Sequence, residues 1–250
     1  MSARDEFFVG FFPVPPGLRA FLLAAGALLI LVFGAVGWLA ATAQRAPEAG
    51  GFRFDLGEQE VTGVLQLSPY PLLYVTEGNE RLPAGRTMML SGGGKFSPPQ
   101  AEGMDGTLVR AKGVILKRGD LDMLQIGWGP EALTPLEGAA AIPAEVPLGR
   151  WRLTGEICDG KCAAGAMRPG RGLAHKACAN LCVIGGVPAV FVSAAPVEGS
   201  EFLLLAGPDG GPLPEAALAH MAAIVTAEGE ISRRGDLLVF RIDPASLAPI

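Results

Sequence analysis

Residues 111–126 read AKGVILKRGDLDMLQI, and residues 227–242 read AEGEISRRGDLLVFRI. In each stretch, runs of alternating apolar and polar residues flank Arg-Gly-Asp, which is typical of two β-strands joined by a tight hairpin turn. The two stretches begin 116 residues apart. The match indicates that the chain contains two copies of one β-rich unit.

Further matches extend the repeat toward the N-terminus. The matching segments are 71–75 with 188–192, 87–92 with 202–207, and 62–65 with 154–157. The first two pairs are separated by 117 and 115 residues, but the third pair is separated by only 92. We therefore expect a tandem duplication whose second copy gained about 25 residues between its first and second strands.

Each copy reads as three strands, a short connection and two more strands. In the second copy the connection, residues 214–224, begins with Pro and favours a helix. In the first copy the same place, residues 98–103, favours a loop. This element order resembles the OB-fold, a small five-stranded Greek-key barrel, over roughly residues 57–243.

The resemblance implies a mainly β protein with two tandem OB-like five-stranded barrels. We expect the first barrel over residues 45–148 and the second over residues 149–250. The second would carry the extra segment, residues 158–187, as a grafted Cys/His-rich loop. The first barrel lacks this insert and is expected to be purely structural, with Gly92-Gly93-Gly94-Lys95 as a hairpin turn.

A long apolar run precedes the repeats. Residues 20–44 carry no charge, and at about 1.5 Å per residue a helix of this length crosses a bilayer. We expect an uncleaved transmembrane helix behind an N-terminal segment, residues 1–19. The aromatic run at residues 7–13 would lie at the lipid headgroups or, alternatively, pack against a partner membrane subunit. The alternative is a cleaved signal peptide, since residues 41–43 have a small-x-small pattern, but the run exceeds the usual apolar length of about 7–15 residues.

Composition and the absence of known motifs limit the classes of organism and of function that we expect. Abundant Ala, Gly and Arg are typical of a GC-rich bacterial genome, and the net charge of −5 indicates no nucleic-acid partner. Arginines flank the apolar run on both sides and leave its orientation open. The sequence contains no P-loop, dinucleotide fingerprint, G-x-S-x-G or H-E-x-x-H motif, so we expect no catalytic residues and no autonomous enzyme.

The insert holds every cysteine of the chain and one of its two histidines, as a candidate ligand set: Cys158, Cys162, His175, Cys178 and Cys182. Residues 173–184 favour a helix that ends at Gly185-Gly186. On this helix the last three candidate ligands fall at i, i+3 and i+7, which places them on one face.

Three interpretations of this cluster stay open. Two disulfides would staple a glycine-rich loop in an oxidising compartment. A metal centre with copper, zinc or an iron–sulfur cluster would use the thiolates and the imidazole, although no C-x2-C pair of a zinc ribbon is present. A thiol redox pair would use Cys178 and Cys182. The cysteine segment is also similar to segments of bacterial membrane-anchored proteins, a resemblance that implies no activity.

Function follows as an expectation from these features. We expect a single-pass protein of the bacterial inner membrane, with its barrels in the periplasm, that serves as an accessory or electron-transfer-associated subunit of a membrane complex. The insert carries a net charge of +3, which favours docking to an acidic partner or an anion, and the alternative is a solvated face. The alternative is a thiol oxidoreductase or metal-delivery protein that uses Cys178 and Cys182 chemically.

Overall fold

The computed structural model describes residues 14–43 and 49–250. The chain divides into two compact units, Met1–Ala46 and Pro47–Ile250, and each is described by itself. Most of the expected N-terminal segment, including its aromatic run, lies outside the described residues.

The first unit contains one long helix, α1 (Pro16–Ala43). After Arg19 in its first turn it is apolar all round, with Phe21, Ile30 and Phe33 exposed along its length, as expected of a helix that faces lipid. Its segment Pro16–Thr42 is long and apolar enough to cross a membrane, with a mean hydropathy of 2.5. The predicted apolar helix is confirmed, and it can serve as a single membrane span or as a signal sequence.

The first barrel is built from the first copy of the repeat. Its strands are β2 (Gln59–Gln66), β3 (Leu72–Glu77), β4 (Thr87–Ser91), β5 (Leu108–Arg118) and β6 (Leu121–Ile126). Neighbours β2–β3, β3–β4, β5–β6 and β2–β5 pair antiparallel, and β4 pairs parallel with β6, which closes the sheet. Short strands β1 (Gly51–Phe52) and β7 (Leu133–Pro135) add to β5.

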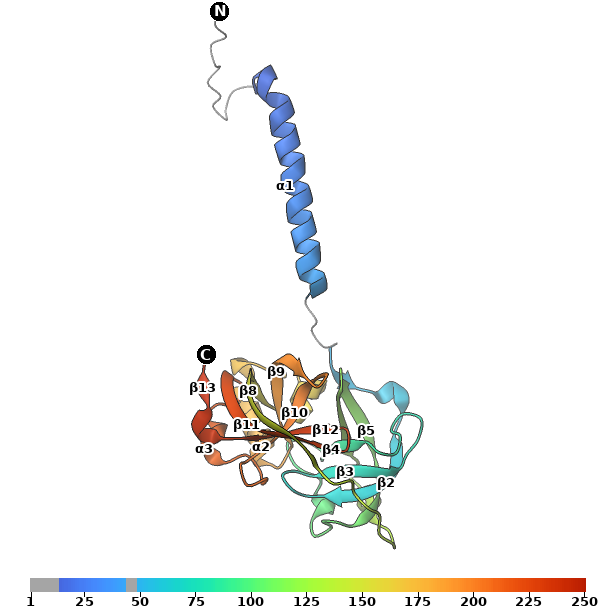
Figure 1. Ribbon diagram of the computed structural model, residues 1–250. Coiled ribbons are helices and arrows are strands. Elements are labelled where there is room, and N and C mark those ends of the chain that lie inside the picture. The colour runs from blue at the N-terminus through green and yellow to red at the C-terminus, as the bar shows by residue number, and fades with distance from the viewer. Residues whose placement is uncertain (1–13, 44–48) are drawn as a thin grey trace, which may run out of the picture. The chain divides into compact units, whose positions relative to one another are not determined.

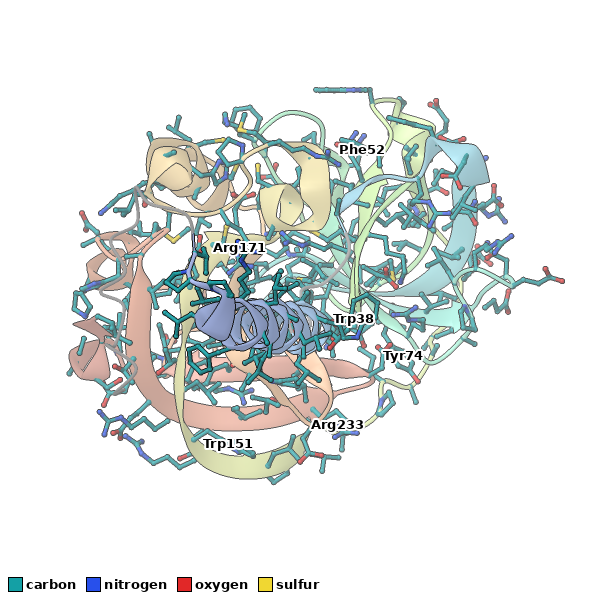
Figure 2. All side chains as sticks on the ribbon, turned by 90° about the horizontal axis from the view of Figure 1, so that it is seen from above. Trp38, Phe52, Tyr74, Trp151, Arg171 and Arg233 are labelled. Atoms are coloured by element: carbon teal, nitrogen blue, oxygen red, sulfur yellow. The ribbon has the colours of Figure 1, made fainter. Side chains whose placement is uncertain are left out.

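The second barrel repeats this order (Figure 1). Its strands are β8 (Val146–Asp159), β9 (Ala189–Val197), β10 (Ser200–Ala206), β11 (Ile224–Arg234) and β12 (Leu237–Ile242), with β13 (Ala248–Pro249) added to β11. Strand β10 pairs parallel with β12, and β8 closes onto β11. The mainly β fold with two tandem five-stranded barrels is thus confirmed. Figure 2 labels Phe52 on β1 and Trp151 on β8, which lie on different barrels.

Equivalent glycines show that the two copies share one backbone geometry. Gly119 and Gly235 in the two Arg-Gly-Asp turns have φ of 57° and 62°, a left-handed conformation that glycine adopts without a steric penalty. In the strands before these turns, a Cβ on Gly113 or Gly229 would collide with the carbonyl of the neighbouring strand. The repeat read from the sequence therefore corresponds to a structural duplication.

Several helical turns connect the strands. They are η1 (Phe54–Leu56), η2 (Pro99–Ala101), η3 (Pro130–Ala132), η4 (Cys162–Ala166), η5 (Leu173–His175), α2 (Lys176–Ile184), α3 (Glu215–Leu218) and η6 (Pro244–Ser246). The expected loop at residues 98–103 contains only the single turn η2.

The helix expected at residues 214–224 is much shorter than predicted. Only α3 is α-helical, and the chain then pairs with β8. Met221 forms a parallel bridge with Ile157, and the Ala222 amide donates to the Ile157 carbonyl at 2.7 Å. Because residues 221–222 form hydrogen-bonded pairs with β8, the helix ends before them and β11 begins at Ile224.

One hydrophobic cluster contains residues of both barrels and of the insert. Leu72 and Met123 of the first barrel cluster with Phe191 and Phe240 of the second and with Cys182 of the insert. The two phenylalanine rings meet edge to face, with centroids 5.4 Å apart. A separate cluster fills the interior of the first barrel. The insert thus packs into this cluster, and whether both barrels fold without it stays a prediction.

Candidate metal centre

The insert folds into two short helical segments after β8. The turn η4 begins at Cys162, and η5 and α2 follow as one helical run over Leu173–Ile184. Gly186, two residues after the end of that run, has φ of 88°, and the amides of Gly186 and Val187 donate to the carbonyls of Val183 and Cys182. These paired bonds form a Schellman stop. The helix and its glycine stop were predicted correctly.

The structure brings all five predicted ligands together. Three groups have ligand atoms within 4.8 Å of one another: Cys162 with His175 and Cys178, Cys158 with Asp159 and His175, and Asp159 with Cys162 and Cys182. Cys158 was expected in a loop, but it lies near the end of strand β8. The arrangement places soft sulfur donors and an imidazole around one small volume, which suits a thiophilic metal ion.

Asp159 is a member of the cluster that the ligand prediction missed. Its Oδ2 lies 2.9 Å from Nε2 of His175, and its Oδ1 accepts the Cys162 amide at 2.8 Å. The side chains of Asp159 and His175 are 0% and 1% exposed, so the expectation of an exposed imidazole under the staple interpretation is wrong. The sequence did carry a signal for Asp159, because it is the only acidic residue of the insert.

The four thiols have different environments. Cys158 is buried and donates to the Gly170 carbonyl at 3.1 Å, and burial raises its pKa far above the usual range. Cys162 and Cys182 share a hydrogen bond that raises the pKa of Cys162 and lowers that of Cys182. Cys178 is the only cysteine that is not fully buried.

Lys95 reaches the cluster from the first barrel. Its Nζ lies 2.6 Å from Cys178 Sγ and 4.0 Å from Cys182 Sγ. The loop that carries Lys95 is held against the insert, because Lys161 Nζ donates to the carbonyls of Gly92 and Gly94 at 2.7 and 2.9 Å. The Gly-rich segment thus contacts the cluster, while the purely structural role of the first barrel stays a prediction.

The positive side chains of the insert bond to groups of the protein, although Lys161 is the only one of the four that is buried. Lys161 is only 4% exposed, and burial lowers its pKa. Arg171, labelled in Figure 2, pairs with buried Glu156 at 3.2 Å, and Lys176 donates to the Ala219 carbonyl at 2.7 Å. These contacts stabilise the insert itself, and the basic docking face stays a prediction.

All four cysteines are free thiols in the structure, and the staple interpretation has no support from their arrangement. Fold and site together define a protein of two tandem five-stranded barrels with a buried Cys/His/Asp cluster that can hold a metal ion. No known protein family, curated protein or solved structure matches this chain.

Proposed function

We propose that this chain is a metal-binding protein whose insert holds one thiophilic ion. The observation that carries the proposal is the convergence of Cys162, His175 and Cys178, with ligand atoms within 4.8 Å. The buried carboxylate of Asp159 at the imidazole strengthens it. Metal-ligating histidines commonly present their second ring nitrogen to such a carboxylate, which fixes the ring and raises its basicity.

The proposed ligand set is narrower than the sequence suggested. Nε2 of His175 faces Asp159, so Nδ1 is the ring nitrogen that remains for the metal. Cys162, Cys178 and Cys182 supply the thiolates, and Cys158 supports them as a protonated thiol bonded to a backbone carbonyl. Three sulfurs and one nitrogen fit a closed, four-coordinate zinc site, and copper(I) or an iron–sulfur centre are the alternatives for this donor set.

The cellular setting completes the proposal. The apolar helix anchors the chain in the bacterial inner membrane, and the two barrels, related to OB-like modules by their element order, face the periplasm. There the protein serves as an accessory or electron-transfer-associated subunit of a membrane complex. The apolar span and a buried metal site without an accompanying catalytic motif support this role.

A thiol oxidoreductase or metal-delivery protein is the second candidate function. The position of Cys178 favours it, because this thiol is the least buried of the four and lies beside the Lys95 ammonium. A neighbouring cation stabilises a thiolate, which is the nucleophilic form. In this function Cys178 and Cys182 would cycle between dithiol and disulfide.

Metal analysis of the protein purified from membranes under reducing conditions tests the proposal. We expect about one equivalent of metal in the wild type, and at least a tenfold lower affinity in His175→Ala, since even loss of a residue that only supports a ligand costs about 10–100-fold. His220→Ala, at the only other histidine of the chain, is the matched control and should keep its metal. A metal-free wild type with one exchangeable disulfide would instead establish the redox function.

Orientation has its own test. A C-terminal alkaline phosphatase fusion should be active and a cytoplasmic reporter silent, because alkaline phosphatase needs disulfides that form in the periplasm. The reverse pattern would contradict the periplasmic assignment.

A further inference from the structure

The contact between Lys95 and Cys178 is short for a hydrogen bond between an ammonium group and sulfur. Nζ and Sγ are 2.6 Å apart. An ammonium hydrogen bond to oxygen measures about 2.7–2.9 Å, and sulfur is the larger atom, so an ammonium–sulfur hydrogen bond is longer still. A distance of 2.6 Å instead fits two atoms that are each bonded to one bridging atom between them.

We propose that Lys95 and Cys178 are the two ends of a nitrogen–oxygen–sulfur bridge that forms on oxidation and closes the metal site. The bridge itself requires only these two side chains. Its regulatory consequence, the exclusion of metal, rests on the function proposed above.

The backbone around Lys95 and around Cys178 is held in place by other contacts. Two carbonyls of the loop before Lys95 are fixed by the buried ammonium of Lys161, and the Ser97 amide after it donates to the Gly185 carbonyl at 2.9 Å. On the other side, Cys178 is held on the helix α2. Because both ends are fixed by contacts of their own, bond formation requires little loss of conformational freedom.

Dioxygen can supply the bridging atom and balance the reaction. Once the Lys95 ammonium has passed a proton to the Cys178 thiolate, the resulting amine and thiol react with one dioxygen to give the bridge and one water. One S–H bond, one N–H bond and the O–O bond break, and one S–O bond and one O–N bond form. Sulfur and nitrogen each give up two electrons, which reduce both oxygen atoms, and the two hydrogens leave in the water.

Position selects Cys178 over the other thiols. Cys158, Cys162 and Cys182 are buried, and Lys95 Nζ is 4.0 Å from Cys182 Sγ. The partly exposed Cys178 is therefore the thiol that an oxidant in solution reaches first, since oxidation follows exposure and thiolate character. The bridge would join the first barrel to the insert and remove one thiolate from the ligand set.

Mass spectrometry of the metal-free protein after exposure to air tests the bridge. We expect a gain of one oxygen and a loss of two hydrogens on the intact chain, and a cross-linked peptide pair that contains Lys95 and Cys178. A thiol reductant should reverse the mass change and make Cys178 available to alkylation. A wild type in which Cys178 stays alkylatable, forms a disulfide, or is oxidised without a link to Lys95 would overturn the proposal.

Three variants define the chemistry. Lys95→Arg keeps the positive charge but removes the amine, and Cys178→Ser removes the sulfur, so neither should give the cross-link. Lys176→Arg is the matched control, because it makes the same change two residues from Cys178 on a side chain that bonds the Ala219 carbonyl. It should cross-link like the wild type, and a cross-link that persists in Lys95→Arg would contradict the assignment of Lys95.

Zinc binding separates this proposal from the metal function. The reduced wild type should bind Zn²⁺, and the bridged wild type should bind it at least tenfold more weakly. A cross-link together with no Zn²⁺ binding in the reduced protein would leave the bridge standing and refute the metal function. Zn²⁺ binding without a cross-link would support the metal function and refute the bridge.

Discussion

Nε2 of His175 lies 2.9 Å from Oδ2 of Asp159, and both side chains are almost completely buried. A buried carboxylate needs partners because leaving it unpaired away from water is very unfavourable. Asp159 has two, the imidazole and the Cys162 amide. The same carboxylate therefore orients two of the proposed metal ligands, one through a side chain and one through the backbone.

Asp159→Asn should weaken metal binding about 10–100-fold. The amide keeps the size of the side chain but carries no charge, so it holds the imidazole less firmly and makes it a poorer donor. Competition with a chelator of known affinity measures the change. Asp120→Asn, in an exposed hairpin turn, is the control, and equal losses in both variants would contradict the role of Asp159.

Cys158→Ser and Cys178→Ser should behave differently. Serine retains the donor that Cys158 offers to the Gly170 carbonyl, so we expect Cys158→Ser to bind metal nearly as well as the wild type. Cys178→Ser removes a proposed thiolate and should lose at least about tenfold in affinity. Titration with Cd²⁺, followed by its thiolate absorption, distinguishes the two. Loss of binding in Cys158→Ser alone would reverse the assignment.

Lys161→Met should destabilise the protein although Lys161 is not a metal ligand. Its ammonium satisfies the carbonyls of Gly92 and Gly94, and leaving buried polar groups without partners costs about 1–3 kcal/mol. Denaturant unfolding of the metal-free protein measures the loss. Lys176→Met, on a more exposed side chain, should cost less, and equal stability of both variants would count against the cross-barrel role of Lys161.

Tyr70 links the barrels through its hydroxyl, which accepts the Leu213 amide at 3.1 Å. Tyr70→Phe should lower the free energy of unfolding by about 1–3 kcal/mol, because a buried donor loses its partner. Tyr74→Phe, at the only other tyrosine, is the control, and a similar loss there would contradict the assignment.

Tyr70 should also make the stability of the fold depend on pH in the alkaline range. Burial raises the pKa of Tyr70 to about 12, whereas the unfolded phenol ionises near pH 10. The unfolded state therefore releases its proton first, and stability falls as the pH rises from about 10 toward about 12. Tyr70→Phe should lack this part of the decline, and an unchanged slope would show that other groups cause it.

The sequence predicted the elements that depend on local patterns. The Arg-Gly-Asp turns are readable because hairpins need glycine at a left-handed position, and the repeat spacing then defined two barrels. The helix of the insert was readable from its apolar spacing and from Gly186 as its stop.

Contacts between distant segments could not be read in this way. Lys95 lies 83 residues from Cys178 in sequence, and only the packing of the two barrels brings the side chains together. The early end of the helix after Leu218 has the same cause, because β8 pairs with Met221. The inward direction of Lys161 depends on carbonyls of the other barrel, which no pattern within the insert reveals.

The central claim is that the insert binds a metal ion through sulfur and His175. Titration of the reduced, metal-free protein with Co²⁺ tests it most directly, because thiolate ligands give intense charge-transfer absorption and a four-coordinate ion gives strong visible bands. We predict saturation at about one equivalent in the wild type and in His220→Ala, with altered bands and weaker binding in His175→Ala. A wild-type spectrum that stays that of hydrated Co²⁺, or three indistinguishable titrations, would contradict the account.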